Sequence, residues 1–159
     1  MRQSHPFDPI IFPDSRILIL GTFPSLDSFK YRFYYAHPRN QFWKLLGTIY
    51  AMPYGSREER VAILKRHHLA LWDVISGCER KNSLDSNLKA CTPNDIPGLL
   101  KRYPGIEKIL FTGAKAEELF GRFFKDLKIE TTRLPSPSPA YAAMTFNEKL
   151  KRYKEALLG

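Results

Sequence analysis

The sequence predicts an α/β protein: a three-layer sandwich with a central, mostly parallel four-stranded sheet. Short apolar segments typical of buried strands alternate along the chain with segments whose apolar residues recur at helical spacing. No internal repeat, low-complexity tract or linker interrupts this alternation, so we expect a single domain over residues 1–159. A chain of 159 residues with 43% hydrophobic residues is large enough to bury one core.

Four segments are expected to form the strands, and the last of them should lie near an edge of the sheet because polar residues alternate along it. The expected strands are RILIL at 16–20, LALWDVI at 69–75, EKILFTG at 107–113 and KIETTRL at 128–134.

The intervening segments are expected to be helices. The second of them opens with Ser56 and has Glu59 three residues later, which is a capping-box start. The expected helices cover residues 41–50, 56–68, 93–104, 114–127 and 147–158.

Ligands of such sheets bind beyond the carboxyl ends of the strands. Four loops should lie there: GTFPS at 21–25 with the following YYAHPRN, the long segment 76–92, the turn at 112–113, and PSPSPAY at 135–141. Long loops in a compact domain are more often functional than idle.

Composition narrows the class of protein. Lys and Arg outnumber Asp and Glu by 25 to 16, and the net charge of +9 favours a polyanionic partner, nucleic acid before an acidic membrane surface. The two cysteines, Cys78 and Cys91, are too few for a disulfide scaffold, an iron–sulfur cluster or a cysteine-rich zinc site. We expect no metal, no cofactor and no membrane span, and a cytoplasmic location.

The segment YYAHPRNQFW gathers aromatic, basic and amide side chains within ten residues. Asn40 is either the N-cap of the helix that follows or a carboxamide that reads a base edge or positions a water, and both hold if the cap faces a pocket. His37 either contacts a phosphate or base or is a satisfied loop histidine. Phe42 and Trp43 are expected in the core, whereas Tyr34 or Tyr35 is expected to lie against a ligand ring.

Two further loops have alternative interpretations. GTFPS is either an ordinary turn after a strand or a site where a ligand approaches backbone amides, and it matches neither a dinucleotide fingerprint nor a P-loop. PSPSPAY is either a rigid loop that grips phosphates or a polyproline-type surface loop.

The other charged residues that stand out are best explained by structural roles. Asp73 ends a strand on the functional side, but a turn-forming or N-capping role is favoured over a general base. KRHH at 65–68 lacks partners at metal-ligand spacing and is interpreted as a solvated helix end, and KRYK at 151–154 as a solvated helix face.

GTFPS, YYAHPRNQFW and LPSPSPA, in this order and at strand ends, together resemble the uracil-DNA glycosylase superfamily over nearly the whole chain. The combination of GTFPS with YYAHPRNQFW is most similar to its hypoxanthine-DNA glycosylase branch. Two departures stand out: Phe23 occupies the place where many members carry a water-activating Asp or Asn, and Leu134 occupies the place of the usual His. The resemblance implies that Asn40 takes the central catalytic role.

The resemblance also implies a set of site residues. Asn40 is the catalytic candidate, and the base pocket is expected from Gly21, Thr22, Phe23, Pro24, Tyr35 and His37. DNA contacts are expected from Ser25, Pro135, Ser136, Pro137, Ser138, Ala140 and Tyr141, with Ala140 or Tyr141 filling the gap left by a flipped base.

The hypothesis is therefore a monomeric DNA glycosylase that hydrolyses the N-glycosidic bond of a deaminated base, hypoxanthine before uracil, after base flipping. The alternatives are a catalytically inactive nucleic-acid-binding module of the same fold and a small-molecule α/β hydrolase. The sequence leaves open whether Asp73, Asp85 or Asn87 joins the site.

Overall fold

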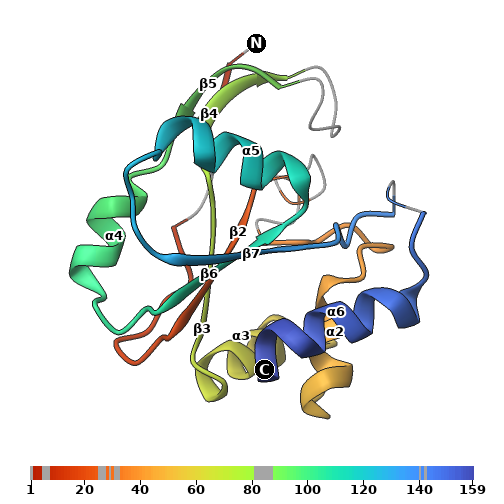
Figure 1. The fold of residues 1–159 in the computed structure, drawn as a ribbon. Helices are drawn as coiled ribbons and strands as arrows, with labels where there is room; N and C mark the ends of the chain where they lie inside the picture. The colour runs from red at the N-terminus through yellow and green to blue at the C-terminus, as the bar shows by residue number, and fades with distance from the viewer. Residues whose placement is uncertain are drawn as a thin grey trace.

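The computed structural model describes residues 2–4, 8–24, 28, 30, 33–80, 88–139, 141 and 143–159. Its centre is a four-stranded parallel sheet in the order β3-β2-β6-β7 (Figure 1). The strands are β2 (Ile17–Gly21), β3 (Leu69–Asp73), β6 (Lys108–Thr112) and β7 (Glu130–Leu134). This agrees with the expected fold class, and β7 lies at an edge as its polar alternation predicts.

The five helices assigned in the described chain cover the two faces of this sheet. They are α2 (Phe42–Tyr50), α3 (Arg57–Arg66), α4 (Ile96–Arg102), α5 (Ala114–Phe123) and α6 (Phe146–Leu158). Helices α2, α3 and α6 lie together on one face, and α4 and α5 on the other (Figure 1). The three layers are those of the predicted sandwich.

Strand β2 shows how the sequence builds both cores. Leu18 and Leu20 belong to the apolar cluster beneath α4 and α5, whereas Ile19 belongs to the cluster beneath α2, α3 and α6. Successive side chains of a strand point to opposite faces, so a continuous apolar run is the signature of a strand buried on both sides.

The helix starts follow local capping chemistry. The Ser56 hydroxyl accepts the Glu59 amide and the Glu59 carboxylate accepts the Ser56 amide, so the capping box predicted for α3 is confirmed. Helix α4 is shorter than expected because Asp95 caps it by accepting the amide of Gly98. Helix α5 ends at Phe123 rather than near residue 127.

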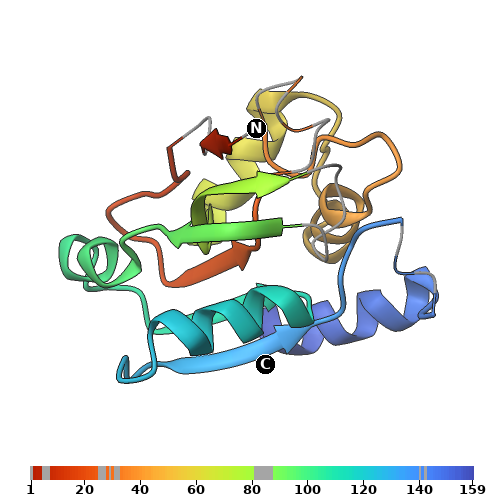
Figure 2. The same cartoon turned by 90° about the horizontal axis from the view of Figure 1, so that it is seen from above.

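A second sheet was not expected. Strands β1 (Arg2–Ser4), β4 (Ile75–Arg80) and β5 (Leu88–Pro93) form an antiparallel sheet in the order β1-β4-β5, and β4 and β5 lie side by side in Figure 2. The prediction of a loop is therefore wrong over 76–80 and 88–92, and residues 81–87 lie outside the described residues. Strand β4 lacks an apolar run because only part of it faces the core: Cys78 is buried, whereas Glu79 is exposed.

Within the described segments, no helix combines the length and the apolar composition that a membrane crossing requires.

Candidate active site

The carboxyl ends of the parallel strands bring distant parts of the sequence together. Gly21 at the end of β2 pairs with Asp73 at the end of β3, and Thr112 at the end of β6 pairs with Leu134 at the end of β7. The loops after β2, β6 and β7 therefore start from one edge of the sheet, as parallel topology predicts.

Three polar side chains converge on Gly21. A methyl group at this position would collide with Asp73 Oδ1, lie 3.0 Å from the Tyr35 hydroxyl and lie 3.4 Å from Thr112 Oγ1. The hydroxyls of Tyr35 and Thr112 are themselves 3.0 Å apart. Glycine is required here because these oxygens occupy the space that a side chain would take.

Asp73 is buried, with 4% of its surface exposed. No helix follows it, since β4 begins at Ile75, so the N-cap interpretation is wrong. Its backbone carbonyl accepts the Asn94 side-chain amide at 2.9 Å, which fixes the bend between β3 and β4. A carboxylate buried at a strand end beside hydroxyls is a candidate for direct ligand recognition.

Tyr35 is held in an unusual conformation. Its φ of 54° lies in the left-handed region that tyrosine rarely adopts. Its ring stacks on Phe42 with centroids 4.0 Å apart, and its side chain remains partly exposed. This strained turn aims the Tyr35 hydroxyl at Gly21, and strain of this kind concentrates at functional sites.

The neighbouring rings are structural. Tyr34 is buried and donates its hydroxyl to the carbonyl of Asp8 at 2.9 Å, while Trp43 Nε1 donates to the carbonyl of Tyr34 at 2.9 Å. Burial, with a smaller contribution from the nearby Asp73 charge, raises the pKa of Tyr34 far above its usual value. Phe42 and Trp43 are both buried in the core, as predicted, and Tyr35 rather than Tyr34 faces the site.

Asn40 precedes α2 in a tight turn. Its backbone amide donates to the carbonyl of His37 at 2.9 Å, and its Oδ1 accepts the Phe42 amide at 2.9 Å. Helix α2 therefore begins at Phe42, one residue later than expected, with Gln41 in the capping position. Oδ1 faces the helix amide, and Nδ2 has no hydrogen-bond partner among the described residues, so Nδ2 is the donor left for a ligand.

His37 and the residues after β2 have local partners. His37 Nδ1 accepts the amide of Arg39 at 3.0 Å. The carbonyl of Thr22 accepts the amide of Ile75 at 3.1 Å. Phe23 is 7% exposed and its ring packs in the apolar cluster beneath α4 and α5, so its backbone rather than its ring adjoins the strand edge. Pro24 is buried beside it.

The proline–serine loop, residues 135–141, is anchored from two helices. The hydroxyl of Tyr153 in α6 donates to the carbonyl of Pro135 at 2.7 Å, and the backbone amide of Gln41 donates to the carbonyl of Pro137 at 2.9 Å. Within the loop the amide of Ser138 donates to Ser136 Oγ at 3.1 Å. The loop is therefore fixed beside the Asn40 turn.

The structure describes only some of the predicted DNA contacts. Tyr141 is 39% exposed at the end of the proline–serine loop, where it can meet a partner. The predicted DNA contacts Ser25 and Ala140, and the undecided Asp85 and Asn87, lie outside the described residues.

Sequence reasoning did not select Thr112 or the buried Lys149, and it favoured a purely structural role for Asp73. The available signal was position: Asp73 and Thr112 both end apolar strands that the sequence did predict. The available signal for Lys149 was helical spacing, since it lies three residues after Phe146 and four before Tyr153, on the apolar face of α6.

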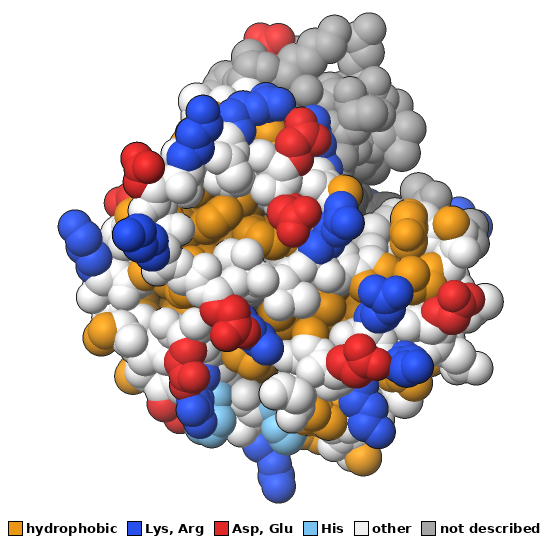
Figure 3. Space-filling model, in the orientation of Figure 1, with side chains coloured by type: hydrophobic (Ala, Val, Ile, Leu, Met, Phe, Trp, Pro, Cys, Tyr) orange, Lys and Arg blue, Asp and Glu red, His pale blue; other side chains and the backbone are white. Residues whose placement is uncertain are grey.

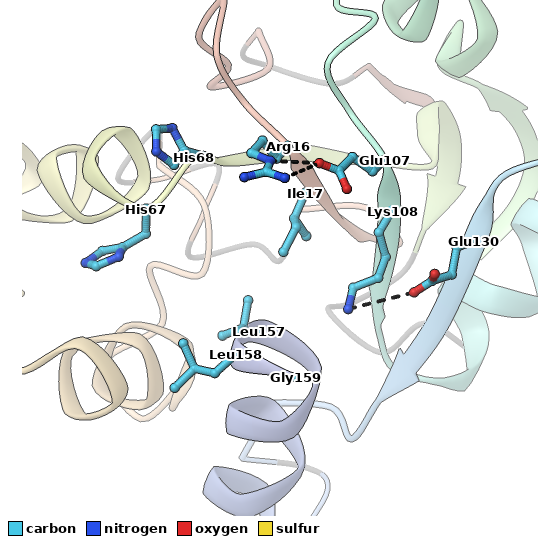
Figure 4. A pocket seen from close by; sticks show the side chains of 10 residues that line it. All are labelled: Arg16, Ile17, His67, His68, Glu107, Lys108, Glu130, Leu157, Leu158 and Gly159. Atoms are coloured by element: carbon cyan, nitrogen blue, oxygen red, sulfur yellow. Dashed lines mark hydrogen bonds and ion pairs between the residues drawn. The ribbon is translucent and has the colours of Figure 1, made fainter.

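The histidines of KRHH lie at the opposite edge of the sheet. They line a pocket of about 380 Å³ where the strands begin (Figure 4). Its charged side chains pair with one another, since Arg16 lies 2.6 Å from Glu107 and Lys108 lies 3.9 Å from Glu130. Across the described residues, no three metal-ligating side chains cluster.

The surface charge is mixed on the face seen in Figure 3, where Lys and Arg alternate with Asp and Glu over β7, α5 and α6. The excess positive charge therefore does not form one continuous patch on this face.

The sequence profile of the Uracil DNA glycosylase superfamily matches residues 9–158. The chain belongs to the uracil DNA glycosylase superfamily. The predicted resemblance is confirmed, and the match covers both the Asn40 turn and the proline–serine loop.

Two relatives and one solved structure are similar to this chain over most of its length. A hypoxanthine DNA glycosylase of Methanosarcina acetivorans is 33% identical over 148 residues, covering 90% of this chain and 91% of the relative. That of Methanosarcina barkeri is 35% identical over 136 residues, covering 84% and 85%. The solution structure of a candidate uracil DNA glycosylase from M. acetivorans superposes with a TM-score of 0.82 at 31% identity, covering 99% of this chain and 97% of the other.

Proposed function

We propose that this chain is a monofunctional DNA glycosylase that removes hypoxanthine from DNA. The observation that carries the proposal is the buried Asp73 carboxylate, which lies with the Tyr35 hydroxyl beside Gly21 at the carboxyl ends of the strands. Asn40 follows Tyr35 by five residues, and its Oδ1 accepts the Phe42 amide, which leaves Nδ2 as its donor. Superfamily membership and two relatives named hypoxanthine DNA glycosylase support it.

The recognition chemistry follows from the edge of the base. Hypoxanthine presents a carbonyl oxygen beside a ring N–H. Asn40 Nδ2 donates to the carbonyl, and the Asp73 carboxylate, which only accepts, takes the ring N–H. Adenine presents an amino group and an unprotonated ring nitrogen, so the same pair of groups faces it with the wrong polarity. Uracil shares the edge of hypoxanthine and is the expected second substrate.

The ring of Tyr35, which is partly exposed and is backed by the buried ring of Phe42, gives the base a flat wall. Flipping a base into such a site costs a few kcal/mol, and less for a poorly paired lesion. A deoxyinosine opposite a mismatched base is therefore favoured over a normal nucleotide before any hydrogen bond forms.

The reaction is a hydrolysis. The C1′–N9 bond breaks and its electron pair leaves with the base, which takes up a proton, while a water oxygen bonds to C1′. Positive charge develops on the sugar and negative charge on the base. The Asn40 Nδ2 donor stabilises the base as it gains negative charge, and preorganised donors of this kind are among the largest contributions to enzymatic rates.

DNA is the partner in this proposal. Ser136 and Ser138 contact phosphate oxygens through their hydroxyls, which is a common way that proteins position a nucleic-acid backbone. Ser25 stays a predicted phosphate contact. Tyr141 occupies the gap that the flipped nucleotide leaves. We further propose that the chain acts as a single-domain monomer in the cytoplasm.

The test is single-turnover cleavage of duplexes that carry one deoxyinosine or one deoxyuridine, with alkali to reveal abasic sites. Asn40→Ala should abolish excision, whereas Asn147→Ala on the exposed face of α6 should cleave like the parent. Asp73→Asn should lower the rate about 10- to 100-fold, the loss expected for one charge-assisted hydrogen bond.

The alternatives give different results. DNA binding without turnover would support the inactive binding module. Turnover of neither substrate together with no salt-dependent DNA binding would support the small-molecule hydrolase. Either result would overturn the proposal.

A further inference from the structure

The first turns of α6 contain a buried lysine. Lys149 lies four residues into the helix and has only 2% of its surface exposed, whereas its helix neighbours Lys151 and Lys154 are exposed. A cation near the start of a helix opposes the positive end of the helix dipole, and its burial removes the hydration of the ammonium. The position is unfavourable for a charge on both counts.

No carboxylate in the described part of the chain compensates this charge. Its recorded partners are the Gln41 side chain, whose Oε1 accepts from Nζ at 2.8 Å, and the ring of Tyr141, whose centroid lies 5.5 Å away. Burial lowers the pKa of the Lys149 ammonium. A methionine would fill this space without the desolvation cost, so packing does not explain a lysine here.

The contacts of Lys149 join the two segments of the candidate site. Through Gln41 Oε1 it holds the residue next to Asn40, and the backbone amide of the same Gln41 binds Pro137 in the proline–serine loop. One helical turn later, on the same face of α6, Tyr153 binds Pro135 in that loop. Helix α6 thus fixes the Asn40 turn and the loop relative to each other.

We propose that Lys149 is a positioning residue for base excision, acting through Gln41 to hold the Asn40 turn in register with the proline–serine loop. This proposal rests on the proposed glycosylase function. Asn40 must meet the base while the loop holds the phosphates, so an error in their separation misplaces the scissile bond. Misplacement of about 1 Å can cost about 100-fold in rate.

The experiment compares Lys149→Met, Gln41→Met and the double variant by single-turnover excision of deoxyinosine, with DNA affinity and thermal unfolding measured in parallel. Each single variant should cleave about 10- to 100-fold more slowly at saturating enzyme. The double variant should be no slower than the worse single variant, because both changes break one link. Lys149→Met should unfold at the same temperature as the parent or higher, because it removes a buried charge.

Lys151→Met is the matched control, since it removes an equal charge from the exposed face of the same helix. It should leave the excision rate at saturation unchanged. Lys149→Met should leave the salt dependence of DNA binding unchanged, because a positioning lysine neutralises no phosphate.

Four results would overturn the proposal: parental excision by Lys149→Met, additive losses in the double variant, an equal loss in Lys151→Met, or a reduced salt slope in Lys149→Met. If Lys149→Met does not fold, Gln41→Met alone tests the proposal. Parental excision by Gln41→Met would show that the hydrogen bond between Lys149 and Gln41 does not position Asn40. A parent protein that does not cleave deoxyinosine refutes the proposed function instead, and the two failures are thereby distinguished.

Discussion

Gly21→Ala is the substitution whose effect the structure determines most directly. The added Cβ would overlap Asp73 Oδ1 and stand 3.0 Å from the Tyr35 hydroxyl, at an edge where these side chains are buried or half-buried. Neither neighbour can withdraw freely: Asp73 is 4% exposed, and Tyr35 is stacked on Phe42 with its hydroxyl 3.0 Å from Thr112 Oγ1.

The magnitude follows from overpacking. Forcing one methyl group into a filled core site costs about 1–3 kcal/mol of unfolding free energy. The cost should be near the upper end, because the displaced atom is a carboxylate oxygen that loses its position rather than a flexible apolar tip. Displacement of Asp73 and Tyr35 should also slow excision of deoxyinosine by at least about 10-fold, the rate equivalent of ~1.4 kcal/mol.

Two glycines provide controls for stability and for activity. Gly121 in α5 has open space around its Cβ position, so Gly121→Ala should be neutral or stabilise by about 0.5–1 kcal/mol. Gly47 in α2 has the ring of Tyr54 against it, so Gly47→Ala should destabilise the fold. Urea unfolding gives the free energies, and single-turnover excision well below each unfolding midpoint gives the rates.

The reasoning would be refuted if Gly21→Ala had parental stability, because the polar side chains would then not fill that space. It would also be refuted if Gly21→Ala lost stability but cleaved at the parental rate per folded molecule. The first result would contradict the packing of polar side chains around Gly21, and the second would contradict the role of these side chains in excision.

Three further predictions concern contacts away from the reacting atoms. Tyr153→Phe leaves the carbonyl of Pro135 without its 2.7 Å donor, so it should lower the unfolding free energy by about 1–2 kcal/mol and slow excision. An unchanged excision rate would show that this hydrogen bond from α6 does not position the loop. Ser56→Ala removes the α3 capping box and should cost about 1 kcal/mol in urea unfolding with no effect on excision, so slower excision would contradict the placement of the site. Burial raises the pKa of Tyr50 to about 12, whereas an unfolded tyrosine ionises near 10. The stability from keeping this phenol protonated is therefore present below pH 10 and lost as the pH rises toward 12; Tyr50→Phe should reduce the loss measured by urea unfolding at pH 9 and 11.

The central sheet could be predicted because its strands are short apolar segments that can be recognised in the sequence. Ile19 and its apolar neighbours form a continuous run, which a strand buried on both faces requires, and Ser56 with Glu59 marks a helix start in the sequence itself. Asn40 could be selected because the motif around it resembles the superfamily, although an asparagine before a helix also fits a cap.

The remainder depends on tertiary contacts that leave no local trace. The antiparallel pairing of β4 with β5 joins segments of mixed polarity, and Asp73 resembles any aspartate at a turn until Gly21 and Tyr35 are brought against it. Helical spacing places Lys149 on the same face as Phe146 and Tyr153, but only the packing of α6 against Gln41 shows which group it binds.

The most direct test of the central claim uses the parent protein alone. Matched duplexes carrying deoxyinosine or deoxyadenosine at one position would be incubated with excess protein, and the released base would be identified by chromatography. The account predicts free hypoxanthine from the first duplex, an abasic site in its place, and no detectable adenine from the second. Release of both bases at similar rates, or of neither while the DNA remains bound, would contradict it.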